Sequence, residues 1–300
     1  MQWYHILIIV FVSSIIISLF VSVSIFMAYN ITHPHHFGRD EVKNRWEKYK
    51  VDEIDEKIKR TDIEFKMKDG YIIHGDYVLA NNSNKFVICV HGFSTNREAE
   101  MPYGFIFYHL GHNVLVYDQR GHGDNEAALT KMGIDEASDL DEIINQLKLK
   151  FGNDIEIGLH GVSMGASTCL MLTRIRQDIK FIVDDCGFVR FSNVIIKQLN
   201  KRHFPGVIFM PFVSFTCKIM YGFSLKDASI EKYIGDINVP TLIFHGSNDS
   251  FVPVFNSNLL NDKLKCKHKL VVYNCEHADC MRFNKEEYRR EIEEFLKGIE

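Results

Sequence analysis

The sequence lacks three features: a basic stripe, a regular spacing of cysteines and an internal repeat. Its 35 Lys and Arg are scattered among 39 Asp and Glu, and the net charge is −4. Nucleic-acid-binding surfaces need clustered positive charge, so we expect no nucleic acid as a partner. The seven cysteines are an odd number and do not form a disulfide framework. Cys275 and Cys280 lack the second pair of a zinc site, so we expect buried free thiols and neither a metal nor an organic cofactor.

Charge is also absent from Ile6 to Ala28. As a helix this run is about 34 Å long, enough to cross the hydrocarbon core of a bilayer. Trp3 and Tyr4 at one end and Tyr29 at the other suit the two membrane interfaces. A cleaved signal peptide is the alternative, but no Lys or Arg precedes the run, which is longer than a usual signal core. We therefore predict that residues 1–32 form a retained, single-pass anchor in the lipid bilayer.

The two flanks of this segment differ in charge. No Lys or Arg precedes it, whereas four basic residues follow it within about 20 positions. The positive-inside rule therefore favours a cytoplasmic location for the folded domain. The four residues are Arg39, Lys43, Arg45 and Lys48.

Residues 33–60 are interpreted as a juxtamembrane stalk. The histidines around Pro34 are typical of a solvated loop rather than of a metal site. From Asp40 to Arg60 the chain is charged, with apolar residues spaced as in a helix that packs on the domain or on the bilayer surface. These apolar residues are Val42, Trp46, Tyr49, Ile54 and Ile58.

Residues 61–300 are long enough for one α/β domain with a full core. A hairpin opens it, with Lys68-Asp69-Gly70 as the turn, and strands then alternate with helices. This order predicts a doubly wound, mainly parallel sheet with an antiparallel edge. The expected strands are 63–67, 71–79, 86–90, 114–117, 155–159, 181–183, 241–244 and 270–273, and the expected helices are 101–110, 135–150, 166–176 and 284–296.

One stretch, at about 187–234, breaks the alternation. Its middle, Phe204 to Phe223, is rich in aromatic and aliphatic residues and contains two prolines. The stretch is too long for a simple loop. We interpret it as a helical cap that forms a lid and an apolar pocket wall; the alternative is a pair of ordinary core helices.

The pentapeptide Gly161-Val162-Ser163-Met164-Gly165 lies between an expected strand and an expected helix. It matches G-x-S-x-G, the sharp turn that exposes a nucleophilic serine at the top of a sheet. A serine hydroxyl needs a base, and the base needs an orienting acid. Asp249 and His277 each follow a later strand, in the order Ser, acid, His, and all three loops open on the carboxyl edge of the sheet. Ser163, Asp249 and His277 are therefore the candidate catalytic residues; Asp184 and Asp185 are alternative acids.

The oxyanion of such a reaction needs two backbone N–H donors. Met164 follows the nucleophile at a helix N-terminus, where free N–H groups favour negative charge. The second donor is expected from the loop His91-Gly92-Phe93-Ser94, and Phe93 N–H is the choice. His91 is expected to shape this loop rather than to transfer protons.

Together these motifs resemble those of the α/β-hydrolase superfamily. The matching pieces also include Tyr117 to Gly123, Asp249 to Pro253 and Glu276-His277-Ala278. The chain is most similar to a bacterial, membrane-anchored group akin to the esterase/lipase and serine aminopeptidase-like branches, on Val183 to Gly187 and Tyr221 to Ser229. One departure is Ala166, where many relatives carry a second glycine.

The resemblance and the motifs lead to one main hypothesis. We expect a serine hydrolase that cleaves carboxylic esters of apolar acyl groups through an acyl-enzyme. A serine peptidase with the same three residues and a non-catalytic membrane scaffold are the alternatives.

Overall fold

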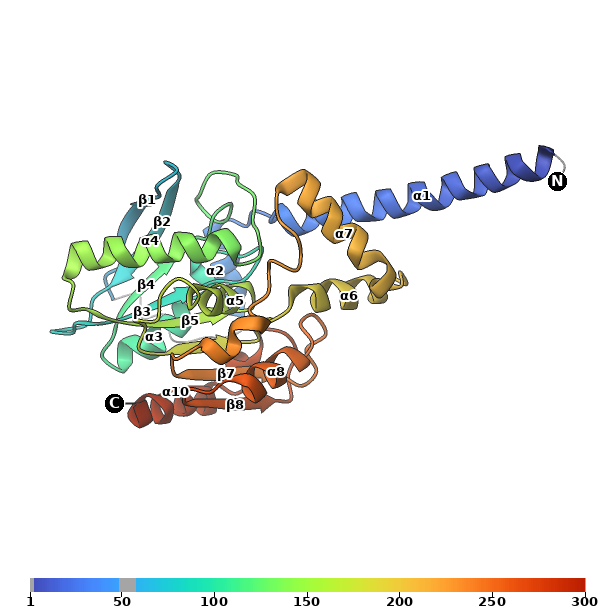
Figure 1. Ribbon diagram of the computed structural model, residues 1–300. Coiled ribbons are helices and arrows are strands. Elements are labelled where there is room, and N and C mark those ends of the chain that lie inside the picture. Colours follow the sequence, from blue (N-terminus) through green and yellow to red (C-terminus); the bar gives the residue numbers. More distant parts are fainter. Residues whose placement is uncertain (1–2, 49–57, 300) are drawn as a thin grey trace.

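All the predicted strands form, and they assemble into one sheet of eight strands in the order β1-β2-β4-β3-β5-β6-β7-β8. The computed structural model describes residues 3–48 and 58–299 (Figure 1). The strands are β1 (Thr61–Lys66), β2 (Ile72–Val78), β3 (Lys85–Val90), β4 (Asn113–Tyr117), β5 (Glu156–Val162), β6 (Ile182–Asp185), β7 (Thr241–Gly246) and β8 (His268–Tyr273).

The strands β4, β3, β5, β6, β7 and β8, in their order across the sheet, run parallel to one another. β1 and β2 form the antiparallel edge. Helices separate the parallel strands in sequence, as right-handed crossovers require. The carboxyl ends of these strands therefore meet at one edge. The predicted doubly wound, mainly parallel sheet with a hairpin at its border is confirmed.

Helices cover both faces of the sheet (Figure 1). Along β3, Phe86, Ile88 and Val90 face one core, whereas Val87 and Cys89 face the other. The first core includes side chains of α4 and α5, and the second includes side chains of α3 and α10. The period-2 alternation of side chains in a strand that is buried on both sides explains its unbroken apolar sequence. These helices are α3 (Met101–His109), α4 (Ile134–Phe151), α5 (Met164–Leu172) and α10 (Lys285–Ile299).

Some boundaries differ from the expectation. β5 continues to Val162, three residues beyond the expected end, so the candidate nucleophile follows the strand directly. Helix α8 (Phe255–Lys263) was not predicted, because its sequence is mostly polar and only Asn256, Ser257 and Leu260 are buried. The remaining short helices are η1 (Arg97–Ala99), η2 (Glu231–Asp236) and α9 (Cys280–Phe283).

The expected helical insertion lies between β6 and β7. It consists of α6 (Phe191–Lys201) and α7 (Gly206–Tyr221), followed by η2. α6 contacts the loop of the candidate acid, because Lys197 Nζ donates to the carbonyl oxygen of Asp249 over 2.6 Å. The insertion is thus tied to the edge of the sheet where the candidate site lies.

Helix α1 (Trp3–Thr32) projects away from the domain (Figure 1). It is long and apolar enough to cross a membrane. Its last turns instead join the core, where Met27, Ala28 and Ile31 are buried.

The segment after α1 lies against the domain. Asn96 Nδ2 donates to the carbonyl of Phe37 over 2.9 Å. Arg39, the first residue of α2 (Arg39–Lys48), pairs with buried Asp76 and Glu98 at 2.8 and 2.6 Å. Residues 49–57 of the predicted stalk lie outside the described residues. The division into 1–32, 33–60 and 61–300 stays a prediction.

Asp184, near the end of β6, is fully buried. Its Oδ1 accepts a 2.9 Å hydrogen bond from Gly187 N–H, whereas Oδ2 has no partner among the described residues. Burial disfavours the charged carboxylate and raises the pKa of Asp184 to about 7. The folded chain therefore holds this proton more tightly than the unfolded chain does.

We predict that D184N reduces the pH dependence of stability. As pH rises from about 4 to about 7, the unfolded carboxyl ionises first, so the native chain loses on the order of 1 kcal/mol per pH unit from this group. An amide cannot ionise. Thermal melting of the detergent-solubilised chain at graded pH should show a smaller decline for D184N than for wild type; equal slopes would contradict the prediction.

Candidate active site

Ser163 occupies a strained turn between β5 and α5. Its φ of 56° and ψ of −113° are unusual for a residue with a side chain. Ser163 N–H donates to the carbonyl oxygen of Asp185 on the neighbouring strand over 2.8 Å, which holds the turn against the sheet. Sharp backbone reversal directs the hydroxyl toward the carboxyl edge of the sheet.

The flanking glycines are required by close backbone contacts. A Cβ atom at Gly165 would lie 1.9 Å from the carbonyl oxygen of Val90, and one at Gly161 would lie 2.5 Å from Ala166 N. Ala166 itself, where the resemblance led us to note a departure, fits beside Gly187: a Cβ there would come within 2.9 Å of the Ala166 methyl. Gly187, which follows β6, therefore leaves room for the methyl group of Ala166.

The structure brings Ser163, His277 and Asp249 together. His277 Nε2 lies 2.9 Å from Ser163 Oγ, and His277 Nδ1 lies 2.6 Å from Asp249 Oδ2. An ionised carboxylate only accepts hydrogen bonds, so Nδ1 carries the proton and Nε2 is free to accept the serine proton. This tautomer is the one that a histidine base requires.

Asp249 is held by a set of donors. Its Oδ1 accepts the N–H groups of Phe251 and Val252 at 2.8 and 2.7 Å. Burial by itself favours the neutral acid, but hydrogen bonds to His245 and His277 outweigh it and lower the pKa of Asp249. The carboxyl is therefore ionised at neutral pH, with its orientation determined by the loop.

His245 is a functional candidate that the sequence reasoning missed. Its Nε2 lies 3.3 Å from Asp249 Oδ2, and its Nδ1 lies 2.6 Å from Ser257 Oγ. Burial opposes protonation, but the bond to Asp249 and its charge raise the pKa of His245. The signal was available in His245-Gly246-Ser247-Asn248-Asp249, where the histidine precedes the acid by four residues.

The alternative acids lie elsewhere. Asp184 and Asp185 are both buried in β6. Burial raises the pKa of Asp185 to about 6. The backbone carbonyl of Asp185 supports Ser163, while the carboxylate that contacts His277 belongs to Asp249.

The two candidate oxyanion donors belong to segments next to Ser163. Met164 is the first residue of α5, whose first N–H groups have no partner within the helix. Phe93 follows Gly92, at which a Cβ would lie 3.5 Å from Ser163 Cβ. Phe93 also lines the cavity that contains the serine.

His91 holds the loop of Phe93 in place. It is fully buried, its Nδ1 lies 2.7 Å from the carbonyl oxygen of Gly92, and its Nε2 accepts Gln119 N–H over 2.8 Å. Burial lowers the pKa of His91 to about 4, so the ring is neutral. Both ring nitrogens of His91 are therefore engaged in contacts with the backbone, as expected for a residue that shapes the loop.

A cavity of about 430 Å³ opens beside Ser163 and His277. Its wall is mostly apolar, with Phe93, Tyr103 and Phe251 among the lining residues. Glu100 also belongs to the wall. Its Oε2 lies 3.2 Å from His160 Nδ1, and burial, together with the nearby charge of Asp185, raises the pKa of Glu100 well above its usual range. Burial thus favours the uncharged form of the Glu100 carboxyl.

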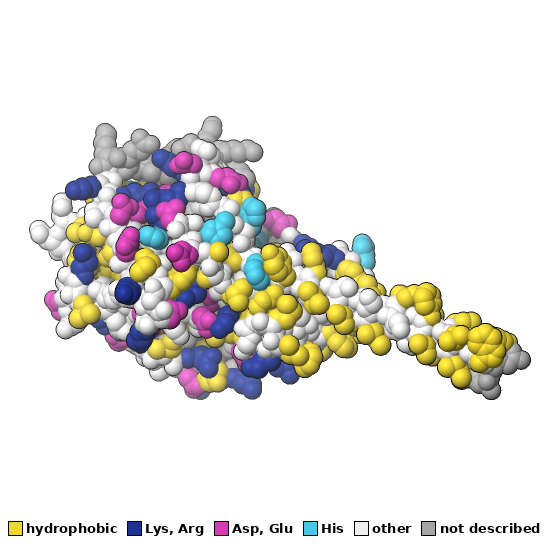
Figure 2. Space-filling view, turned by 90° about the horizontal axis from the view of Figure 1, so that it is seen from above, with side chains coloured by type: hydrophobic (Ala, Val, Ile, Leu, Met, Phe, Trp, Pro, Cys, Tyr) yellow, Lys and Arg dark blue, Asp and Glu magenta, His cyan; other side chains and the backbone are white. Residues whose placement is uncertain are grey.

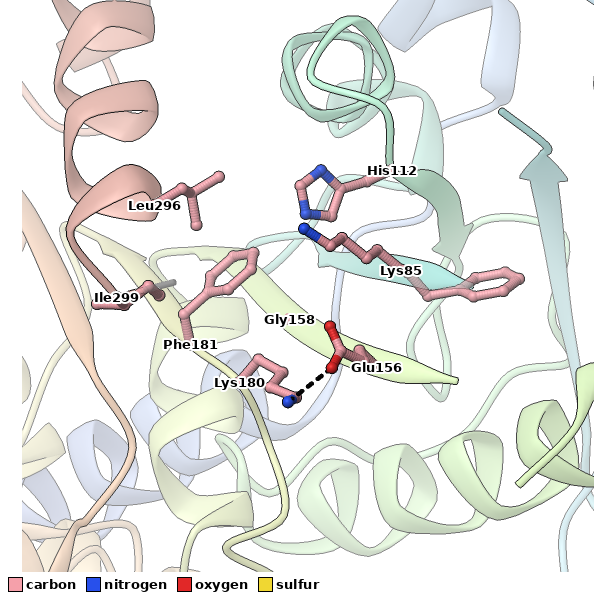
Figure 3. Close-up of a pocket in the computed structure, with 9 residues that line it drawn as sticks. Lys85, His112, Glu156, Gly158, Lys180, Phe181, Leu296 and Ile299 are labelled. Carbon is pink, nitrogen blue, oxygen red and sulfur yellow. Dashed lines mark ion pairs between the residues drawn. The ribbon is translucent and has the colours of Figure 1, made fainter. Parts of the chain in front are cut away.

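A second cavity, of about 460 Å³, lies at the opposite edge of the sheet (Figure 3). Lys85 and Glu156 begin β3 and β5, and Lys180 pairs with Glu156 at 2.7 Å. Among the described residues, its lining contains no serine or cysteine. It is separated from the candidate nucleophile by the length of the strands.

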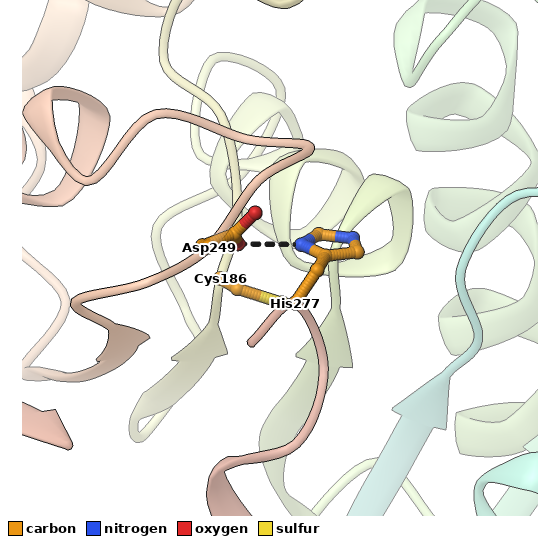
Figure 4. Close-up of side chains that lie close together, drawn as sticks. All are labelled: Cys186, Asp249 and His277. Carbon is orange, nitrogen blue, oxygen red and sulfur yellow. Dashed lines mark hydrogen bonds and ion pairs between the residues drawn. The ribbon is translucent and has the colours of Figure 1, made fainter. Parts of the chain in front are cut away.

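Cys186 lies next to the acid and the base (Figure 4). Its Sγ, a carboxylate oxygen of Asp249 and a ring nitrogen of His277 lie within 4.8 Å of one another, a set that could hold a metal ion. However, Asp249 and His277 already bond to each other, and burial raises the pKa of the Cys186 thiol well above its ordinary value. A neutral thiol is a poor metal ligand, so the donor set fits a proton-transfer pair better.

Comparison with known proteins identifies the fold family. A family model for the alpha/beta hydrolase fold matches residues 85–187. The Bacillus subtilis protein YqkD, described as uncharacterized, is 30% identical over 248 residues, which is 81% of each chain. The chain belongs to the α/β-hydrolase family.

Two more distant similarities are informative. The Pyrococcus furiosus esterase Pf2001 superposes with a TM-score of 0.65 at 24% identity, over 80% of this chain and 92% of that one, which shows a shared fold. The thiohydrolase aneE of Aspergillus aculeatus is 25% identical over 134 residues, covering 43% of this chain and 42% of that one.

We predict that G165A disrupts the site. The added methyl collides with the Val90 carbonyl, so either β3 or the turn must move. Fluorophosphonate labelling of Ser163 should slow at least tenfold, and the melting temperature should fall by several degrees. The matched control is G38A, because no atom lies within 4 Å of that position. If G165A is labelled at the wild-type rate, the close approach of Gly165 to Val90 is not needed for a reactive Ser163.

Proposed function

We propose that this α/β-hydrolase family member is a serine hydrolase that cleaves carboxylic esters through an acyl-enzyme. The observation that supports it most is the continuous pair of contacts from Ser163 through His277 to Asp249, at 2.9 and 2.6 Å. Such a chain is the arrangement that activates a serine hydroxyl.

The proposed reaction has two steps. Ser163 Oγ attacks the carbonyl carbon while its proton passes to His277 Nε2, and Asp249 stabilises the resulting imidazolium. The Phe93 and Met164 N–H groups bind the oxyanion. His277 then protonates the departing alcohol. In the second step His277 takes a proton from water as the water oxygen attacks the acyl carbonyl, and it then gives this proton to Ser163 Oγ as the acyl–serine bond breaks and the acid leaves.

An apolar acyl group is the proposed substrate portion. Support comes from the aromatic wall of the cavity beside the serine, which would remove such a group from water. Relatives whose names include an esterase and a thiohydrolase are compatible with acyl transfer.

The peptidase alternative has less support. Recognition of a peptide's free amino terminus needs an ionised carboxylate in the cavity. Glu100 is the acid in the wall, but burial raises its pKa and so disfavours the ionised form, and its Oε2 already contacts His160. A non-catalytic scaffold would not require the strained backbone at Ser163, which costs free energy.

We further propose that α1 is retained as a membrane anchor. Met27, Ala28 and Ile31 belong to the folded core, and Thr130 N–H donates to the carbonyl oxygen of Thr32 over 3.0 Å. Removal of the helix as a signal peptide would expose this core surface. The flanking charge favours a cytoplasmic domain.

We predict that acyl esters are hydrolysed and that S163A is inactive. The test is a panel of p-nitrophenyl esters from acetate to laurate, together with amino-acid p-nitroanilides. Turnover should rise with acyl length over the shorter members because each added methylene contributes apolar burial. The control is S247A, which removes an exposed serine from the loop of the acid. Cleavage of the anilides without cleavage of any ester would overturn the ester proposal in favour of the peptidase.

We predict that D249N and D185N separate the two candidate acids. D249N should lower kcat by about 10³ to 10⁴, because an amide can favour the wrong tautomer of His277. D185N should change kcat by only a few-fold, since it preserves shape and the Asp185 backbone contact to Ser163. Steady-state kinetics at pH 7.5, with melting temperatures to confirm folding, provide the comparison. The reverse ranking would assign the acid to Asp185.

A further inference from the structure

The outer face of α7 is apolar and exposed. Ile208, Phe212, Phe215 and Ile219 follow one another at spacings of three or four residues, so they share one face of the helix. Phe215 is 65% exposed. An exposed apolar face of this length is costly in water and indicates an interaction surface.

α7 packs directly on α1 along a side that borders this outer face and shares Phe212 with it. The ring of Phe20 stacks on that of Phe209 with centroids 4.3 Å apart, and it also contacts the ring of Phe212 at 4.9 Å. Farther along, His33 meets Tyr221 at 5.6 Å. The apolar surface of α1 therefore continues onto the insertion, as the yellow side chains in Figure 2 show.

The length of α1 determines where a bilayer must end. The uncharged run of α1, from Ile6 to Ala28, is about 34 Å long as a helix, and Phe20 lies within it. A hydrocarbon core is about 30 Å thick, and a tilted helix needs still more length. A bilayer spanned by α1 therefore reaches the level at which Phe20 contacts α7.

The charge of the insertion suits a lipid surface. From Gly187 to Lys226 the sequence contains no Asp or Glu but six Lys and Arg. Two exposed basic residues precede α7: Lys201 is the last residue of α6, and Arg202 lies in the turn between the two helices. Basic residues beside an apolar helix face are the pattern of helices that lie in the membrane interface and contact lipid phosphates.

A groove between α1 and this turn adds a second apolar feature. It has a volume of about 260 Å³ and is lined by Val23, Phe26, Leu199 and Phe204, with Arg202 among its lining residues. An acyl chain in such a groove would place its headgroup phosphate near the guanidinium.

We propose that α7 is a second membrane-binding element, which lies in the bilayer interface beside α1 with its outer face among the acyl chains. Lys201 and Arg202 contact the lipid phosphates. This inference rests on the proposed anchoring role of α1 and is independent of the proposed chemistry. Because Lys197 of α6 bonds to the Asp249 carbonyl, the membrane-bound insertion is coupled to the loop of the candidate acid.

The test is depth-dependent fluorescence quenching of the full-length chain. In a background of W3F and W46F, which removes both native tryptophans, F215W reports on the outer face of α7. The matched control is L149W, at an exposed position in the last turn of α4. That end of α4 lies on the side of the molecule opposite to α1 (Figure 1). Both proteins are reconstituted at low density in phosphatidylcholine–phosphatidylglycerol vesicles containing brominated phosphatidylcholine.

We expect blue-shifted emission from F215W and at least twofold quenching by the brominated lipid, with neither effect for L149W. Emission of F215W as red and unquenched as that of L149W would overturn the proposal. A blue shift without quenching would also overturn it, because a second copy of the chain would then cover α7. Failure of the protein to float with vesicles would refute the anchor itself, whereas fluorophosphonate labelling of Ser163 would still report on the chemistry.

Discussion

The candidate site depends on one close backbone approach, between Gly165 and the carbonyl of Val90. At this point the turn after β5 presses against the end of β3, and there is no space for a side chain. The contact keeps Ser163 at a positive φ that serine does not adopt readily. It also places the start of α5 beside the Phe93 loop, so nucleophile and candidate oxyanion donors share one rigid support.

Around this turn, burial and the hydrogen-bond partners of each ionisable group determine which form, charged or neutral, is favoured. Burial lowers the pKa of His91 to about 4, so this ring is neutral, and burial raises the pKa of Glu100, which favours its uncharged form; both side chains hydrogen-bond to neighbouring groups. Asp249 is also buried, but two histidines and two backbone N–H groups stabilise its charged form. One carboxylate at this edge is therefore kept ionised and directed at His277, as general-base chemistry by a histidine requires.

The proposed membrane contact of α7 is based on apolar surface that the rest of the protein does not cover. The exposed apolar face of α7 continues to the α1 contact through Phe212, and α1 covers only part of this apolar surface. The proposed contact of the uncovered part with the bilayer would remove it from water. On that proposal, the insertion links a lipid surface, through α6 and Lys197, to the loop that carries Asp249.

The sequence by itself determined the succession of strands and helices, the family, the apolar N-terminal helix and the three residues of the candidate relay, because these depend on local periodicity and on motifs at strand ends. It did not reveal the polar helix α8, whose sequence has no distinctive apolar pattern, and the spacing of four residues between His245 and Asp249 does not by itself show that the two side chains meet. Only the tertiary structure decided that Asp249, and not Asp185, contacts His277, and that α7 lies against α1. Those contacts join residues far apart in the chain, and their geometry is set by how the sheet and the insertion pack.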